Sequence, residues 1–187
     1  MTLHIGSAQR ALMGQSVCGD ALLVIPGERT TIVLADGLGH GPLAAEASAA
    51  LCAFVEAHVT DCLEDVLRGA SQAMAHTRGA AGAIMRIDER TLAMEFAGIG
   101  NVEVQAVSER LVRPFCVPGI IGRRLRKVLR FEYALAPGDL LALYSDGVSS
   151  RFELCKYADC GAKDAATAIL AEHGKSHDDA TCIVVRC

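Results

Sequence analysis

Carboxylates recur where apolar stretches of this chain begin or end. Asp36 and Asp146 each follow an apolar run, and each is followed by a glycine. Asp20 opens a further apolar run, and the pair Asp178 and Asp179 directly precedes another. If these runs are neighbouring strands, the carboxylates converge from distant parts of the chain, and they repel one another unless cations neutralise them. The sequence therefore predicts a cation site built from aspartates at strand ends.

The ligands that these residues offer are oxygen atoms alone. No Cys-x-x-Cys pair or histidine pair at ligand spacing accompanies them, which favours Mg²⁺ or Mn²⁺ over Zn²⁺. In two-metal sites, ions about 3.5–4 Å apart bridge a water and activate it for in-line attack on phosphorus. We therefore expect two Mn²⁺ or Mg²⁺ ions per site and the hydrolysis of a phosphate ester.

The stretch after Asp36 favours a sharp turn into a helix. Gly37, Gly39 and Gly41 let the backbone turn and approach a ligand closely, and Pro42 suits the first position of a helix. A single Asp-Gly pair is typical of an ordinary turn. The second Asp-Gly pair, at the end of another apolar run, is what raises the functional interpretation above that alternative.

The apolar patterns predict an α+β chain with helices packed on the faces of largely antiparallel sheets. Expected strands cover residues 3–12, 18–25, 30–36, 80–87, 91–98, 102–108, 125–135, 140–144 and 180–185. Expected helices cover residues 42–59, a second stretch capped by Asp61, and residues 163–173. The loop of residues 114–124 is a candidate for a mobile flap near the site.

Composition bounds the class of protein. The 187 residues are 51% hydrophobic and 21% charged, which fits one compact domain over residues 1–187 without a sensor or accessory domain. Few aromatics, no Trp and a net charge of −4 argue against nucleic-acid binding. No secretory signal or long apolar run is visible, so we expect no membrane contact. The eight cysteines are expected to be mostly buried side chains in a reducing, cytoplasmic compartment, and the chain to be a monomer.

Four short stretches, taken in order, resemble a known enzyme family. They are Cys18-Gly19-Asp20, Ala35-Asp36-Gly37-Leu38-Gly39-His40-Gly41, Tyr144-Ser145-Asp146-Gly147 and Asp178-Asp179-Ala180-Thr181. The set resembles the SpoIIE-like bacterial branch of the PP2C-type (PPM) protein serine/threonine phosphatases, over nearly the whole chain. The short length and the stretches 71–74, 77–80 and 98–102 are similar to members of this branch that reset the stressosome.

The resemblance implies an αββα sandwich, with two mainly antiparallel β-sheets flanked by helices and a dinuclear metal site at one edge. It implies that Asp36 bridges both metals and that the Gly37 carbonyl binds one of them. Asp146 and Asp178 would bind the second metal, and Asp20 would hold metal-bound water from behind. The catalytic residues implied in this way are Asp36, Asp146 and Asp178.

The implied reaction is hydrolysis of phosphoserine or phosphothreonine on stressosome STAS-domain proteins (RsbR/RsbS-like), which resets the general stress response. The implied attacking group is a metal-bridging water, with no covalent phosphoenzyme. Three alternatives stay open: a catalytically weak PP2C-fold regulatory binding protein, a phosphatase of an anti-sigma-factor antagonist, and a metal phosphoesterase of small molecules. The presence of every ligand carboxylate favours the active protein phosphatase.

The chain departs from the family pattern at three places. Leu38 stands where the eukaryotic branch has a histidine that is thought to protonate the leaving alcohol, and His40 comes two residues later. The proton donor is therefore His40, a metal-bound water, or absent. Asp179 stands where many relatives have Asn, and it is expected to orient water or the site backbone. No arginine matches the eukaryotic phosphate clamp.

One cluster of positive charge stands out, consisting of Arg123, Arg124, Arg126 and Lys127. The simpler interpretation is a strand with a charged outer face. The functional one is a docking edge for a phosphorylated or acidic partner. Two other polar residues, Asp139 and His177, are interpreted as an ordinary turn residue and a solvated loop residue.

Overall fold

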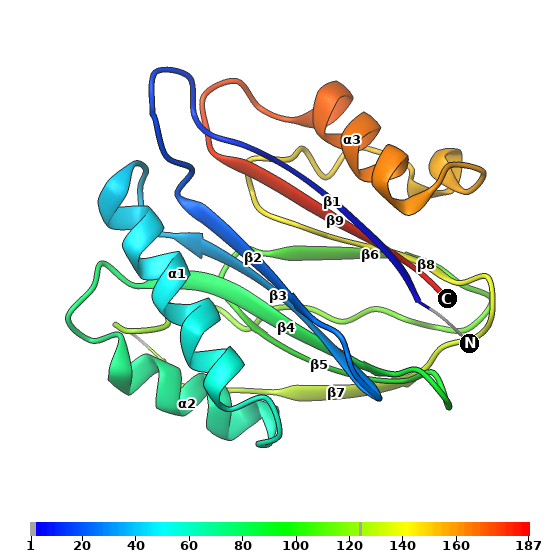
Figure 1. Cartoon of the computed structure of the whole chain (residues 1–187), viewed down its shortest axis with the longest axis horizontal. Coiled ribbons are helices and arrows are strands. Elements are labelled where there is room, and N and C mark those ends of the chain that lie inside the picture. Colours follow the sequence, from blue (N-terminus) through cyan, green and yellow to red (C-terminus); the bar gives the residue numbers. More distant parts are fainter. Residues whose placement is uncertain (1–2, 124) are drawn as a thin grey trace.

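The computed structural model describes residues 3–123 and 125–187, and it arranges them as helix, sheet, sheet and helix layers (Figure 1). One sheet has the order β1-β9-β8-β6 and the other has the order β2-β3-β4-β5-β7, with every pair of neighbours antiparallel. The strands are β1 (His4–Arg10), β2 (Asp20–Ile25), β3 (Arg29–Gly37), β4 (Ala80–Asp88), β5 (Ala93–Ile99), β6 (Glu103–Val107), β7 (Arg130–Ala134), β8 (Leu140–Tyr144) and β9 (Ala180–Arg186). The predicted αββα sandwich is confirmed.

Helices cover the two outer faces of the sandwich. The helices α1 (Pro42–Ala57) and α2 (Leu63–Ala73) lie on the five-stranded sheet, and α3 (Ala162–His173) lies on β1 and β9 of the other sheet (Figure 1). A short 3₁₀ helix, Leu154–Tyr157, precedes α3. Since β3 is covered on both faces, its side chains alternate between two apolar cores: Val33 packs under the helices and Ile32 packs between the sheets.

Two predicted boundaries are wrong. The helix α2 begins after Cys62 and not after an Asp61 cap, because the Cys62 carbonyl accepts the first helical hydrogen bond, from the Val66 N–H at 3.0 Å. The Asp61 carbonyl accepts a hydrogen bond from Arg86 Nη1 at 3.1 Å. The strand expected over residues 125–135 is only the β7 segment, which pairs with β5 no further than Ala97. Beyond Ala97, the edge of β5 is occupied by a bridge between Ile99 and Val117. The described residues just before β7 therefore do not pair with β5.

The cysteines are less buried than expected. Cys52 and Cys182 are buried, whereas Cys62 and Cys155 are exposed and the other four are intermediate. All eight are free in the described part of the chain. Burial raises the pKa of the Cys182 thiol to about 12, so this thiol is a poor nucleophile. Among the described residues, no helix is long and apolar enough to span a membrane.

The core under α1 allows a first prediction. Leu51 of α1 is fully buried, and its Cδ2 lies against the glycine position 82 of β4. We expect Leu51→Ala to lower the free energy of unfolding by about 2–5 kcal/mol, because the contacts are lost and a cavity is left. Leu43→Ala is the matched control on the same helix, since Leu43 is half exposed and should change stability by less than about 0.5 kcal/mol. Urea unfolding measures both, and equal losses would contradict this account of the core.

Candidate metal centre

The predicted aspartates come together at one edge of the sandwich, two from each sheet. Asp20 and Asp36 are direct partners across the β2–β3 ladder, at the first residue of β2 and near the end of β3. Asp146 lies just beyond β8 and Asp178 lies just before β9, and these two strands are paired. The pairing of the strands therefore brings into one site residues that lie near opposite ends of the sequence, such as Asp20 and Asp178.

Two glycines let neighbouring segments approach closely at this edge. A Cβ at Gly37 would overlap the carbonyl oxygen of Ala44 in α1, and a Cβ at Gly147 would overlap the carbonyl oxygen of Asp179. The glycines beside Asp36 and Asp146 are therefore required by close packing.

A pocket of about 260 Å³ opens at this edge, and we call it the metal pocket. Its walls carry the carboxylates of Asp36, Asp146 and Asp178 together with Leu38, Gly39, His40, Ala81 and Asn101. Asp20 and Asp179 are buried and do not line it. The three predicted catalytic aspartates thus face one space, and His40 faces it as well.

The donor set fits hard divalent cations. Three carboxylates from two sheets face the metal pocket, and the side chains lining it offer oxygen ligands in preference to sulfur. Within residues 3–123 and 125–187, however, no group of three or more His, Cys, Asp or Glu side chains already stands where it could hold a metal ion. An open carboxylate pocket suits Mg²⁺ or Mn²⁺ better than a closed cage does, because Mg²⁺ keeps several of its waters and uses few protein ligands.

Negative charge is concentrated at this edge. The pKa of Asp36 is raised to about 8, mainly by burial and secondly by the negative charge of neighbouring carboxylates, of which Asp20 has the largest effect. Burial also raises the pKa of Asp20 to about 6, against the lowering effect of the hydrogen bond from Ser145. Burial, followed by the charge of Asp178, raises the pKa of Asp146. A bound cation would favour the ionised forms and remove this conflict.

Ser145 connects the two sheets behind the metal pocket. Its hydroxyl donates to Asp20 Oδ2 at 2.7 Å and accepts a hydrogen bond from the backbone N–H of Thr181 at 3.0 Å. Asp20 begins a strand of one sheet, whereas Thr181 lies in a strand of the other. This buried chain of hydrogen bonds fixes the Asp20 carboxylate behind Asp36.

Asp179 holds the backbone of the β1–β2 loop. Its side chain is 3% exposed, and Oδ1 accepts a hydrogen bond from the Leu12 N–H at 2.8 Å. Oδ2 is buried without a partner and lies 2.6 Å from where a Cβ of Gly19 would stand. This position suits the expected role in orienting the site backbone.

Three residues at the site were not identified from the sequence. Asn101 Nδ2 donates to Asp146 Oδ2 at 2.6 Å, and Lys175 Nζ donates to the Asp146 backbone carbonyl. Arg78 Nη1 lies 3.0 Å from where a Cβ of Gly39 would stand, so a guanidinium does approach the metal pocket. Asn101 follows an apolar run, as the aspartates do, and that signal could have identified it. Arg78 and Asn101 lie in the stretches 77–80 and 98–102 that resemble the family, but no site role was assigned to either from the sequence, and nothing local marks Lys175.

The cluster of positive charge is not on a strand. Arg123, Arg126 and Lys127 are exposed in the segment before β7, and Arg124 lies outside the described residues. Arg126 lines a separate concavity of about 460 Å³ together with Pro118, Gly119 and Ile120. Asp139 is a turn residue as predicted, because its Oδ2 accepts a hydrogen bond from the Ala136 N–H at 2.8 Å.

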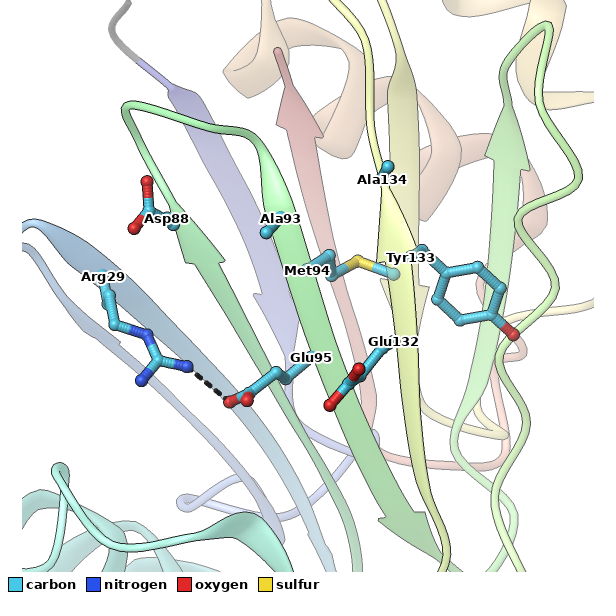
Figure 2. A pocket seen from close by; sticks show the side chains of 8 residues that line it. All are labelled: Arg29, Asp88, Ala93, Met94, Glu95, Glu132, Tyr133 and Ala134. Atoms are coloured by element: carbon cyan, nitrogen blue, oxygen red, sulfur yellow. Dashed lines mark hydrogen bonds and ion pairs between the residues drawn. The ribbon is translucent and has the colours of Figure 1, made fainter.

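A larger concavity, of about 620 Å³, lies elsewhere and carries ordinary ion pairs. Figure 2 shows Arg29 pointing to Glu95, with Glu132 on the neighbouring strand. Arg29 and Arg130 contact Glu95 at 2.6 and 3.2 Å, and Arg130 also contacts Glu132 at 2.8 Å. Glu95 and Glu132 therefore each have a cationic partner, and Asp88 accepts hydrogen bonds from the backbone N–H groups of Arg90 and Thr91.

Comparisons with known proteins agree with this geometry. The model of the Stage II sporulation protein E (SpoIIE) family matches residues 26–187. The phosphoserine phosphatase RsbX of Bacillus subtilis (strain 168) is 28% identical over 139 residues, which are 73% of this chain and 70% of RsbX.

Solved structures give the same result. A chain from work on the bacterial stressosome, described as a modular system adapted to control secondary messenger signaling, has a TM-score of 0.94 at 30% identity, over 100% of both chains. RsbX in complex with magnesium has a TM-score of 0.86 at 25% identity, over 98% of this chain and 95% of the other. The PP2C domain of Bacillus subtilis SpoIIE, at 19% identity, shares the fold with a TM-score of 0.83, over 100% of this chain and 64% of the other.

The fold, the carboxylate pocket at the sheet edge and the match over residues 26–187 lead to one assignment. The chain belongs to the SpoIIE family, the bacterial branch of the PP2C-type protein serine/threonine phosphatases.

Proposed function

We propose that this phosphatase removes phosphate from serine or threonine residues of stressosome STAS-domain proteins. The observation that carries the proposal is the convergence of Asp36, Asp146 and Asp178 on one pocket at the edge of the sandwich. The likeness to RsbX, a phosphoserine phosphatase, and to a chain from a stressosome study supports the choice of substrate.

The residues of the metal pocket have distinct tasks in this proposal. Asp36, the Gly37 carbonyl, Asp146 and Asp178 would hold the divalent cations, while Asp20 would act from behind. Two Mg²⁺ or Mn²⁺ ions, when bound, would supply an activated water and stabilise the charge on the phosphoryl oxygens. Asn101 keeps the Asp146 carboxylate turned toward the pocket, through its 2.6 Å hydrogen bond to Oδ2.

His40 is the proposed donor of a proton to the departing serine or threonine oxygen. Among the described residues that line the metal pocket, it is the one with an imidazole ring, which can act as a general acid. It lies three residues beyond Gly37, in the turn that leads into α1, and it is exposed to the solvent that would restore its proton.

The test of the proposed function is phosphate release from phosphorylated STAS-domain proteins. We expect release with Mn²⁺ and none after EDTA. Asp36→Asn and Asp146→Asn should each lower turnover by more than about 100-fold, because each removes a ligand from a centre that provides several kcal/mol of transition-state stabilisation. Asp159→Asn, at an exposed position far along the chain, is the control. Full activity in either site variant would refute the metal assignment, and wild-type inactivity would favour the regulatory binding protein.

The role of His40 can be separated from that of the metals by the leaving group. We expect His40→Gln to lower phosphoserine-peptide turnover by about 100-fold, the lower end of the range for general acid catalysis. Turnover of p-nitrophenyl phosphate should fall much less, because p-nitrophenolate leaves without a proton. Equal losses on the two substrates would refute a proton-donating role for His40.

The crowded carboxylates also predict how stability depends on pH without metal. The pKa of Asp36 rises from 3.8 to about 8, so the folded protein keeps a proton that the unfolded chain releases within that range. Stability should therefore fall as the pH rises from about 4 to about 8. Thermal unfolding of the metal-free protein would measure this slope, which Asp36→Asn should flatten and Mn²⁺ should oppose at the alkaline end. A stability that rises through this range would contradict the proposed repulsion.

A further inference from the structure

A second pocket joins the metal pocket on one side. It has a volume of about 350 Å³, and we call it the side pocket; its lining is Leu38, Ala81, Gly100, Asn101, Pro118, Gly119 and Ile120. Leu38, Ala81 and Asn101 line both pockets. A molecule whose phosphate group occupied the metal pocket would therefore extend directly over the side pocket.

The far wall of the side pocket is held in place at both ends. On one side, the Val117 N–H donates to the Gly98 carbonyl and the Gly100 N–H donates to the Val117 carbonyl, each at 2.9 Å. On the other side, Ile121 exchanges backbone hydrogen bonds with Ala80 at 2.9 and 3.0 Å. The turn Pro118–Ile120 is thus held between two bridges to β4 and β5, and it forms the wall of the side pocket within the loop of residues 114–124.

The chemistry of the side pocket is apolar. None of its described lining residues is ionisable, and Leu38 is 40% exposed at its mouth. An exposed leucine beside a polar, acidic pocket gains stability when another apolar group covers it. The side pocket therefore suits a hydrocarbon side chain and not a second phosphate or a charged group.

Beyond the apolar wall the surface becomes basic. The concavity that contains Arg126 shares Pro118, Gly119 and Ile120 with the side pocket, and Arg123 and Lys127 are exposed nearby in the chain. The order along the surface is therefore metal pocket, side pocket and basic concavity. A polypeptide chain that advances about 3.3 Å per residue could place successive side chains in these positions, whereas a small phosphate ester could not.

We propose that the side pocket binds an apolar side chain next to the phosphoserine of the protein substrate, and that Arg126 attracts an acidic group further along that substrate. This inference rests on the proposed function and makes it more specific: Ile120 and Leu38 select the sequence around the phosphosite. Charge complementarity supports a phosphorylated, anionic polypeptide as the occupant, because Arg126 lines the basic concavity and Arg123 and Lys127 are exposed in the same segment.

The test compares two phosphoserine peptides, one with Leu and one with Gly at the positions flanking the phosphoserine, and uses p-nitrophenyl phosphate as a substrate without flanking residues. We expect the full chain with Mn²⁺ to prefer the Leu peptide by about 10-fold in kcat/KM. Ile120→Ala should reduce that preference to within about 2-fold, whereas Leu111→Ala, at a 75% exposed position outside the lining, should keep it. Circular dichroism verifies that both variants are folded.

A second variant tests the basic end. Arg126→Glu should slow turnover of a phosphopeptide with a distal acidic residue more than turnover of the same peptide with a neutral residue there. Lys156→Glu, which changes an exposed lysine near α3, is the matched control and should show no such difference.

The outcomes distinguish this inference from the function on which it rests. Turnover of both peptides at equal rates by the wild-type chain, or an unchanged preference in Ile120→Ala, would overturn the side-pocket assignment and leave the phosphatase assignment intact. An Arg126→Glu effect equal for acidic and neutral peptides would overturn the role of Arg126. Absence of Mn²⁺-dependent turnover on every substrate, including p-nitrophenyl phosphate, would overturn the proposed function and this inference together.

Discussion

Repulsion among carboxylates is the constraint on which this molecule depends. Strand register brings five aspartates to one edge of the sandwich, and burial there raises the pKa of Asp36 and of Asp20 well above the ordinary range. The surrounding donors partly compensate: Ser145 for Asp20, Asn101 for Asp146, and the Leu12 backbone for Asp179. The apolar cores supply the stability that holds these charges together, and cations would make the arrangement favourable.

The site belongs to neither sheet alone. Asp36 sits on a strand of the five-stranded sheet, whereas Asp146 and Asp178 flank strands of the other. Their relative position therefore depends on how the sheets pack, and the buried hydrogen bonds of Ser145 fix that packing at the point where it matters. A change far from the pocket that shifted one sheet against the other would alter the metal pocket without touching any ligand.

Sequence patterns predicted features that depend on neighbouring residues, such as strand ends, and missed contacts between distant segments. Each aspartate stands beside a continuous apolar run, so strand ends and site residues could be recognised together, and the ordered motifs gave the family and the sandwich. The contacts of Arg78, Asn101 and Lys175 arise only after distant segments meet, so no local pattern marks them as a group. The bridges at Val117 and Ile121 were missed for the same reason, because they join residues far apart in the chain.

The two glycines at the site separate the requirements of architecture from those of chemistry. Gly37 and Gly147 admit no side chain without displacing the adjacent backbone of Ala44 and Asp179, so mutation there is opposed by folding itself. Mutation of the aspartates beside them is not opposed by folding, because replacing a buried, crowded carboxylate with a neutral residue removes an unfavourable charge from the metal-free protein. Natural drift in descendants of such a gene would therefore erase the chemistry sooner than the scaffold. We therefore expect inactive descendants that keep the sandwich fold and serve only to bind other proteins.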